Sequence, residues 1–218
     1  MTLAAEWLLN PHSSESFWRS GPPKGGPFLL PHYSRVVNSR RSVTDVLLTA
    51  QRVGTLGNRP IDEVIAHALQ FVDALDAGAH RVIDLGTGAG VPGLVIAEAR
   101  PEVALTLVDR RQTRMDALQM AVIGLGWADR IQVLTAEAET LGGEAEHAGT
   151  YDAVVCRGFA NPEITATLAR PFLKNGGSLI VSEPPTFDPS RWPEELCKRA
   201  HFDTPVFQPG VVVLRAIP

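Results

Sequence analysis

From residue 80 onward, short apolar runs alternate with segments in which apolar side chains recur at helical spacing. The short runs predict five strands, at 81–85, 103–108, 130–134, 151–156 and 178–181. Between them, the helical spacing predicts helices at 91–99, 112–124 and 162–173, and a short helical stretch before residue 142. Strands and helices that alternate in this way are typical of a parallel sheet with helices on both faces. We therefore predict an α/β protein with a doubly wound, mostly parallel sheet.

The two flanks of this region follow other patterns. After a helix expected at 192–200, two short apolar runs, 205–207 and 211–216, flank a Gln-Pro-Gly turn. Two runs joined by such a turn predict a hairpin, so we expect the sheet to finish with an antiparallel pair. On the N-terminal side, helices are expected at 42–48 and at 60–75, where apolar residues again recur at helical spacing.

Residues 10–34 are dense in proline, glycine, serine and asparagine and cannot hold a long helix. We interpret residues 1–57 as an irregular N-terminal arm with one short helix, and residues 58–218 as a single domain. The chain has 218 residues, of which 44% are hydrophobic and 20% charged, so it can bury a core of its own.

A glycine-rich loop lies between the first predicted strand and the helix after it. Residues 84–93 read Asp-Leu-Gly-Thr-Gly-Ala-Gly-Val-Pro-Gly. Such glycines, here Gly86, Gly88 and Gly90, let the backbone approach a ligand and direct the amide groups of the helix toward it. The order Gly88-x-Gly90-x-x-Gly93 also matches the dinucleotide-binding fingerprint, with Asp109 about 20 residues later. The loop alone therefore predicts a nucleotide-like cofactor without selecting one.

Asp84 separates two classes of cofactor. It ends the first strand, where we expect its carboxylate to point into the crevice at the carboxyl edge of the sheet. A carboxylate repels a pyrophosphate, whereas it attracts the ammonium group of S-adenosylmethionine. Asp109 ends the second strand and is expected to accept hydrogen bonds from ribose hydroxyls, and Glu137 follows the third strand at the expected place of an adenine amino group. These carboxylates favour S-adenosylmethionine over NAD.

At these residues the sequence resembles the class I methyltransferases, which use S-adenosylmethionine and have a Rossmann-like fold. Within them, residues 81–180 are similar to the small-subunit ribosomal RNA guanine-N7 methyltransferases, also called glucose-inhibited division protein B. The resemblance rests on the Val-Pro-Gly end of the glycine loop and on Arg100-Pro101, Leu107-Val108-Asp109, Arg114, Ala136-Glu137 and the Cys-Arg-Gly-Phe-Ala stretch at 156–160. It implies methyl transfer to guanine N7 of 16S ribosomal RNA and a place in rRNA processing. It also implies donor contacts at Gly86, Val91, Ala136, Glu137 and Arg157.

The chain departs from this family's pattern outside the glycine loop. Ala66-His67 stands where the family has Arg-His, Leu47-Leu48-Thr49 where it has Asn-Leu-Thr, and Thr113 where it has a basic residue. Glu183-Pro184 replaces a Lys-Gly, which reverses a charge on the expected acceptor side. The acceptor therefore stays open between guanine N7, another RNA position and a small molecule. A module that binds the donor without transferring methyl also stays open.

Arg157 and His67 are the two candidate catalytic residues. Arg157 either anchors the donor carboxylate or an acceptor phosphate, or it pairs with a surface carboxylate. His67 is either an acceptor-side residue or a partly buried histidine of an amphipathic helix. Cys156 is interpreted as a core thiol. The remaining histidines show no metal-ligand spacing, so no metal is predicted.

Charge and cysteine content restrict the partners. The formal net charge is −4, yet residues 1–52 hold six Lys and Arg against three Asp and Glu, which leaves an acidic remainder. An RNA partner, either ribosomal RNA or the small ribosomal subunit, therefore needs shape contacts as well as phosphate contacts. Two cysteines without a Cys-x-x-Cys pair, no apolar run of membrane-spanning length and no basic residue before the first apolar stretch predict a cytoplasmic protein without a membrane partner. We expect it to act as a monomer.

Overall fold

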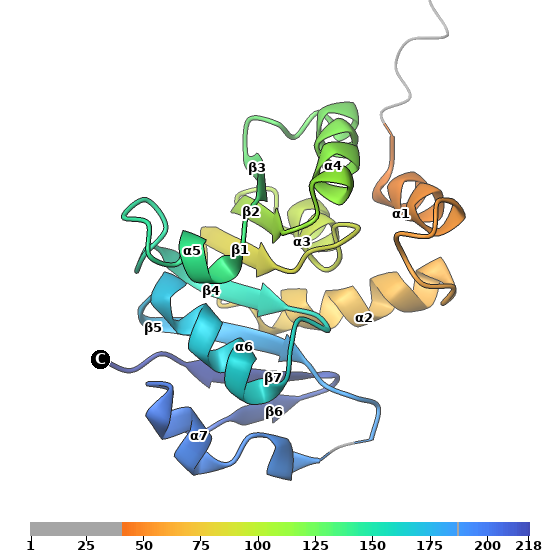
Figure 1. The fold of residues 1–218 in the computed structure, drawn as a ribbon. Helices are drawn as coiled ribbons and strands as arrows, with labels where there is room; N and C mark the ends of the chain where they lie inside the picture. The colour runs from red at the N-terminus through yellow and green to blue at the C-terminus, as the bar shows by residue number, and fades with distance from the viewer. Residues whose placement is uncertain (1–40, 187) are drawn as a thin grey trace, which may run out of the picture. The chain divides into compact units, whose positions relative to one another are not determined.

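The computed structural model describes residues 41–186 and 188–218 (Figure 1). Most of the predicted arm, residues 1–40, lies outside them. The described chain forms a seven-stranded sheet in the order β3-β2-β1-β4-β5-β7-β6. The strands are β1 (Arg81–Leu85), β2 (Ala104–Asp109), β3 (Ile131–Thr135), β4 (Tyr151–Cys156), β5 (Leu173–Ser182), β6 (Val206–Gln208) and β7 (Val211–Arg215). The first five are parallel, and β7 pairs antiparallel with both β5 and β6. The predicted fold and its closing hairpin are confirmed.

The described residues form seven α-helices, most of which flank the sheet: α1 (Val43–Arg52), α2 (Ile61–Ala74), α3 (Gly93–Ala99), α4 (Gln112–Leu125), α5 (Ala138–Leu141), α6 (Pro162–Ala169) and α7 (Glu194–Arg199). Figure 1 shows α5 and α6 in front of the strands and α2 behind them. Alternating strand residues divide the core accordingly: Ala153 and Val155 pack with α1 to α4, whereas Val154 and Cys156 pack with α5 to α7. No helix in the described part of the chain combines the length and apolarity needed to cross a membrane.

Several helix boundaries differ from the predicted ones. The helix expected at 91–99 begins at Gly93, after Pro92. In the helix expected at 162–173, the α-helix ends at Ala169 and a 3-10 helix continues over Arg170–Phe172, after which Leu173 pairs with Tyr151 and opens β5. The helix expected at 192–200 begins at Glu194, since Trp192 is buried and its indole Nε1 donates a hydrogen bond to Glu183. In the last two cases a tertiary contact overrides the local helical pattern.

The short helix α1 is longer than predicted and packs against the main core. Its N-terminus has a capping box, in which the Ser42 hydroxyl accepts from the Asp45 amide and the Asp45 carboxylate accepts from Ser42. Val43 and Leu47 are buried among residues of α2 and α3. Leu47, a departure from the family pattern, therefore serves packing here. The division between an arm and a domain at residues 57 and 58 stays a prediction.

Candidate functional site

The glycine loop follows β1 and turns the chain into α3. Gly86 and Gly88 have φ angles of 71° and 57°, in the left-handed region that favours glycine. Beneath the loop, the Oδ2 atom of Asp84 accepts hydrogen bonds from the Thr87 hydroxyl at 2.8 Å and from the Gly93 amide at 2.9 Å. The carboxylate thus ties the two ends of the loop together.

Asp84 lies beneath the loop, whereas the sequence suggests that it points into the crevice. Its side chain is fully buried, and its Oδ1 atom has no hydrogen-bond partner among the described residues. Burial raises the pKa of Asp84 to about 6, although the hydrogen bonds from Thr87 and Gly93 and the positive charge of Arg157 act in the opposite direction. The site therefore holds a buried acceptor atom with unused capacity and an electrostatic preference for a nearby cation.

A cleft of about 500 Å³ opens beside the loop at the carboxyl ends of β1, β2 and β3. We call it the glycine-loop cleft. It is lined by Gly86, Asp109, Ala136, Glu137, Phe159 and other residues. Asp109 is held in place, because its Oδ2 atom accepts from the Gly88 amide at 3.2 Å and its Oδ1 atom from the Arg111 amide at 3.0 Å. The size lies within the usual range for a small-molecule site, and the position is the one where open α/β sheets bind ligands.

The structure distributes the predicted binding residues over several places. Gly86, Asp109, Ala136 and Glu137 line the glycine-loop cleft. Gly88 borders a neighbouring groove between α1 and α4. The other predicted binding residues outside the cleft are Gly90 and Val91, which are buried, the buried Asp84, and Arg157, which lines a second cleft.

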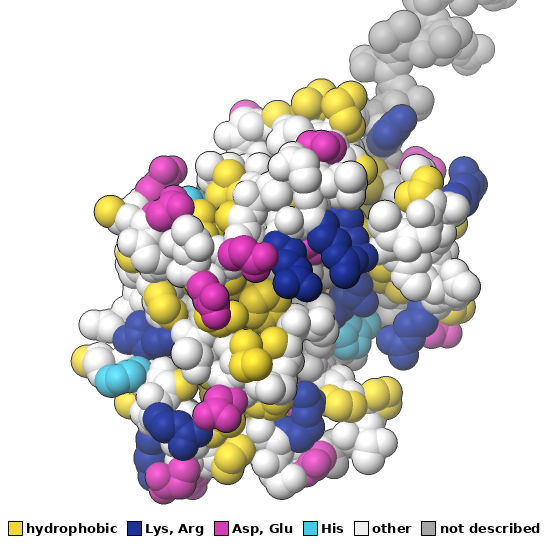
Figure 2. All heavy atoms as spheres, in the orientation of Figure 1, with side chains coloured by type: hydrophobic (Ala, Val, Ile, Leu, Met, Phe, Trp, Pro, Cys, Tyr) yellow, Lys and Arg dark blue, Asp and Glu magenta, His cyan; other side chains and the backbone are white. Residues whose placement is uncertain are grey.

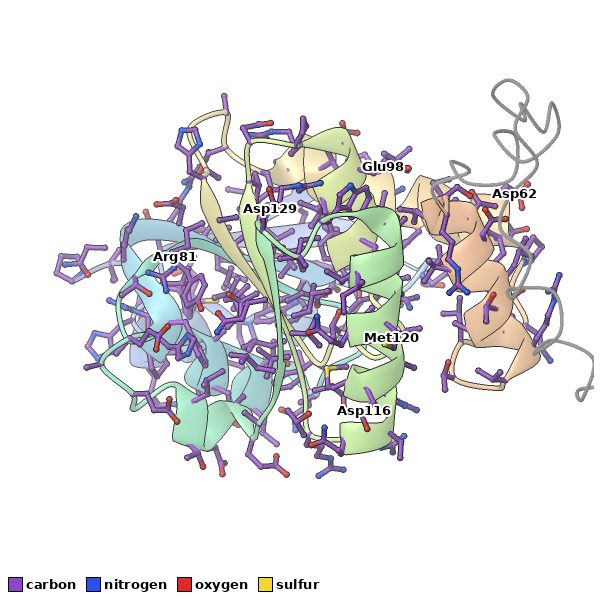
Figure 3. The ribbon with its side chains drawn as sticks, turned by 90° about the horizontal axis from the view of Figure 1, so that it is seen from above. Asp62, Arg81, Glu98, Asp116, Met120 and Asp129 are labelled. Atoms are coloured by element: carbon purple, nitrogen blue, oxygen red, sulfur yellow. The ribbon has the colours of Figure 1, made fainter. Side chains whose placement is uncertain are left out.

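Residues that sequence reasoning gave no firm role also line the glycine-loop cleft. Arg110, Arg111 and Arg114 lie where β2 leads into α4, and Figure 2 shows Lys and Arg side chains gathered in the middle of the face drawn. Figure 3 shows Asp116 near this start of α4, with Met120 farther along the same helix. Phe159 stands so close to Gly86 that a Cβ there would lie 2.7 Å from its ring. The sequence marks Phe159 as a candidate site residue, because it is an aromatic residue three positions after the end of a buried strand.

The second cleft, of about 460 Å³, contains Arg157 and His67, the two candidate catalytic residues. We call it the arginine cleft, because its lining also includes Arg59 and Arg191. The Nε atom of Arg157 donates a hydrogen bond to the Val91 carbonyl at 3.2 Å. Burial lowers the pKa of His67, and the positive charges of Arg157 and Arg59 lower it further. Gly158 lines both clefts, so they adjoin each other.

Glu183 and Cys156 are both turned inward. The Glu183 carboxylate accepts hydrogen bonds from Arg191 Nη1 at 2.7 Å and from Trp192 Nε1 at 2.8 Å. Cys156 is fully buried, and this burial, together with the negative charge of Asp84, raises the pKa of its thiol well above the usual value. A buried thiol kept protonated is a poor nucleophile, in agreement with its interpretation as a core residue.

Comparison with known proteins identifies a matching family and several curated relatives. The sequence model of the family described as rRNA small subunit methyltransferase G matches residues 43–183. Ribosomal RNA small subunit methyltransferase G of Deinococcus radiodurans is 39% identical over 131 residues, which cover 57% of this chain and 50% of that protein. The enzyme of the same name from Deinococcus deserti is 38% identical over 142 residues, covering 62% and 54%. The chain thus spans about half the length of these curated relatives.

Solved structures share the fold at low sequence identity. A SAM-dependent O-methyltransferase from Thermotoga maritima is similar with a TM-score of 0.57 and 14% identity, covering 82% of this chain and 72% of that one. The CurJ carbon methyltransferase is similar with a TM-score of 0.60 and 14% identity, covering 79% and 58%. These similarities agree with the architecture of the sheet and its flanking helices.

Proposed function

The chain belongs to the family of rRNA small subunit methyltransferase G, and on this premise we propose that it transfers a methyl group from S-adenosylmethionine to guanine N7 of small-subunit ribosomal RNA. The observation that carries the proposal is the glycine-loop cleft, with Gly86, Asp109 and Glu137 at the carboxyl ends of three adjacent strands. The family description supports small-subunit ribosomal RNA as the acceptor, the sequence resemblance supports guanine N7, and the cleft supports a place for the donor.

The residues that line this cleft, and those beneath and beside it, fit the proposed donor. The buried Oδ1 atom of Asp84 has unused acceptor capacity beneath the loop, which suits a ligand that carries an ammonium and a sulfonium. Asp109 and Glu137 offer carboxylate oxygens for ribose hydroxyls and an adenine amino group. Gly86 keeps the loop open where a side chain would meet Phe159. We propose that Arg157, beside the shared Gly158, pairs with the donor carboxylate.

The proposed chemistry requires positioning more than proton transfer. When bound, S-adenosylmethionine supplies an electrophilic methyl group. The lone pair of guanine N7 is already free, so the protein needs no strong general base to activate the acceptor. The glycine-loop cleft orients the donor, and the adjoining arginine cleft is the proposed side of acceptor entry. Catalysis then depends on holding two reactants in line and excluding water.

A transfer assay with labelled S-adenosylmethionine tests this function. The acceptors are naked small-subunit ribosomal RNA, assembled small subunits and a pool of small metabolites. We expect label in N7-methylguanosine after digestion of the RNA or of the subunits. Label in another nucleoside or in a metabolite would contradict the proposed acceptor. Donor binding by calorimetry without transfer to any acceptor would indicate a binding module.

We expect Asp109→Ala to weaken donor binding by about 1–3 kcal/mol, because two ribose hydroxyls lose a charged acceptor. Calorimetry with S-adenosylmethionine and with an analogue that lacks both hydroxyls measures the effect. The analogue should bind the parent and the variant about equally. Asp116→Ala is the matched control, since Asp116 is an exposed aspartate on α4 that bonds only Gln112 among the described contacts. If the variant prefers S-adenosylmethionine over the analogue by the same factor as the parent does, Asp109 does not bind the ribose hydroxyls.

A further inference from the structure

The arginine cleft gathers three arginines and one histidine from separate parts of the chain. Arg59 precedes α2, His67 lies within α2, Arg157 follows β4, and Arg191 ends the short 3-10 helix Pro189–Arg191. The charged residues that line this cleft of about 460 Å³ are thus three arginines and one carboxylate, Glu183. Side chains of like charge brought together without matching acids indicate a site for an anion.

Two polar groups in this cleft have unused capacity. The Nδ1 atom of His67 is buried and has no hydrogen-bond partner among the described residues. The described contacts give the Arg157 guanidinium one hydrogen bond, from Nε to the Val91 carbonyl. Its remaining N–H groups are available to a ligand carboxylate or phosphate. The cleft therefore has the charge of three arginines and free guanidinium N–H donors for an anion.

Glu183 does not present its charge to the cleft. Its side chain is only 7% exposed, and both oxygens accept hydrogen bonds, from Arg191 Nη1 and from the indole of Trp192. Its backbone amide donates to the Gly210 carbonyl at 2.8 Å, which fixes the end of β5. Arg191 is 29% exposed, so part of it still reaches solvent. The carboxylate therefore holds the orientation of this arginine.

The arginine cleft adjoins the glycine-loop cleft through Gly158. A single donor carboxylate is satisfied by one guanidinium, and Arg157 immediately precedes Gly158, which lines both clefts. Arg59 and Arg191, which come from other elements, then remain for a second anion. An acceptor base that enters beside the donor brings its own phosphodiester with it.

We propose that Arg59, His67 and Arg191 form the subsite for the RNA phosphodiester next to the methylated base, and that Glu183 is the positioning residue that orients Arg191. The proposal rests on the proposed function and names the part of the RNA that this cleft receives. It also accounts for Glu183 at a place where the family pattern has a lysine, because the positive charge at the cleft comes from Arg191.

The subsite is tested by binding to a fragment of small-subunit ribosomal RNA over a range of salt concentrations. Arg59→Gln should weaken binding and reduce the slope of log affinity against log salt by about 0.7, the value for one lost contact to single-stranded RNA. Arg199→Gln is the matched control, since Arg199 is an exposed arginine that pairs with Glu163 on the surface. Calorimetry with S-adenosylmethionine should give the same donor affinity in both variants. If Arg59→Gln keeps the parental slope, or loses donor affinity instead, the proposal is overturned.

If Glu183 positions Arg191, removing its charge changes the RNA affinity in the opposite direction to the one that simple electrostatics predicts. Loss of a negative charge near a phosphate should tighten RNA binding, whereas loss of the support of Arg191 should weaken it. We expect Glu183→Gln to weaken RNA binding, and to have no further effect in an Arg191→Gln background, because residues that act as a unit are not additive. Glu163→Gln is the control for an exposed carboxylate. Tighter RNA binding by Glu183→Gln, or an equal loss in both backgrounds, would overturn this role.

Two further measurements separate the sources of failure. A parent protein that binds donor but neither binds nor methylates ribosomal RNA would contradict the proposed function itself. Inorganic phosphate at matched ionic strength should not displace the RNA fragment. If it does, and Arg59→Gln abolishes that displacement, the cleft is a site for free phosphate and the RNA proposal fails. The exposed Arg59 keeps the test valid even where a variant at Glu183 does not fold.

Discussion

The Asp84→Asn variant should bind S-adenosylmethionine about 1–3 kcal/mol more weakly than the parent protein at neutral pH. Two physical losses add up to this effect. The isosteric amide removes the negative charge beneath the glycine loop, where the ligand would bring a cation. It also replaces a carboxylate whose Oδ2 atom accepts from both Thr87 and Gly93. Calorimetry measures this loss of affinity, both with the donor and with S-adenosylhomocysteine, the demethylated product that keeps the ammonium group.

The same substitution should change how stability depends on pH. Burial raises the pKa of Asp84 from 3.8 to about 6, so the folded protein without ligand holds this proton more tightly than the unfolded chain. The resulting stabilisation is fully present below pH 3.8 and is lost as the pH rises through about 6. This stabilisation is on the order of 3 kcal/mol, because each unit by which the pKa rises corresponds to about 1.36 kcal/mol and the Asp84 carboxyl is fully buried. The Asp84→Asn variant shows no such loss, because an asparagine side chain does not titrate.

Denaturant unfolding of parent and variant at pH 4 and at pH 7.5 checks this dependence. Relative to the variant, the parent should lose free energy of unfolding between the two pH values. Donor binding should restore part of it, because a bound cation favours the ionised carboxylate. Asp116→Asn, an exposed change on α4, should leave both the donor affinity and the pH dependence as in the parent. A difference between parent and Asp84→Asn that is the same at both pH values would show that Asp84 is not the titrating group.

Much of the fold could be predicted because its signals are local. The β-strand at 81–85, the one at 151–156 and the helix that begins at residue 112 have the predicted starting residues. Short apolar runs bounded by turn residues determine these elements, whatever lies far away in the sequence. The carboxyl ends of parallel strands share one edge, so Gly86, Asp109 and Glu137 were expected to meet, and they line one cleft.

The position of Asp84 shows how far local reasoning reaches. Neighbouring strand residues face opposite sides of a sheet. Ile83 and Leu85 pack with α5 to α7, and Val82 packs with α1 to α4. Asp84 therefore faces α3, where it accepts a hydrogen bond from Gly93. The alternation of β1 contains this information, although the glycine motif alone suggests a carboxylate that points into the crevice.

The arginine cleft could not be predicted from the sequence, because the residues that line it are distant from one another along the chain. Arg59, Arg157 and Arg191 are separated by tens of residues, and no spacing rule relates them. In the sequence, Glu183 stands where the family pattern has a lysine, which suggests that the charge at this place is reversed. Its buried hydrogen bond to Trp192 depends on how the chain returns to the end of β5. Only tertiary packing decides whether such a charge faces a ligand or supports a neighbour.

Gly93→Ala should lower the free energy of unfolding by about 1–3 kcal/mol, the usual effect of adding a methyl group to a filled core. A Cβ at Gly93 would lie 2.3 Å from Leu107 Cδ2 and 2.8 Å from Asp84 Oδ2. Leu107 is fully buried, and the hydrogen bonds of Asp84 hold its carboxylate in place, so neither neighbour can move freely. The donor affinity should fall as well, because α3 and the glycine loop move apart.

Gly78→Ala is the matched control that isolates this steric effect. No atom lies within 4 Å of a Cβ built at Gly78, and its backbone is outside the left-handed region. Both substitutions remove similar conformational freedom from the unfolded chain, which by itself stabilises a protein by about 0.4–1 kcal/mol. Gly78→Ala should therefore be neutral or slightly stabilising, and the difference between the two variants measures the clash. Equal unfolding midpoints for the two variants would mean that α3 adjusts freely, and that the close approach of Gly93 to β2 does not determine the geometry of the loop.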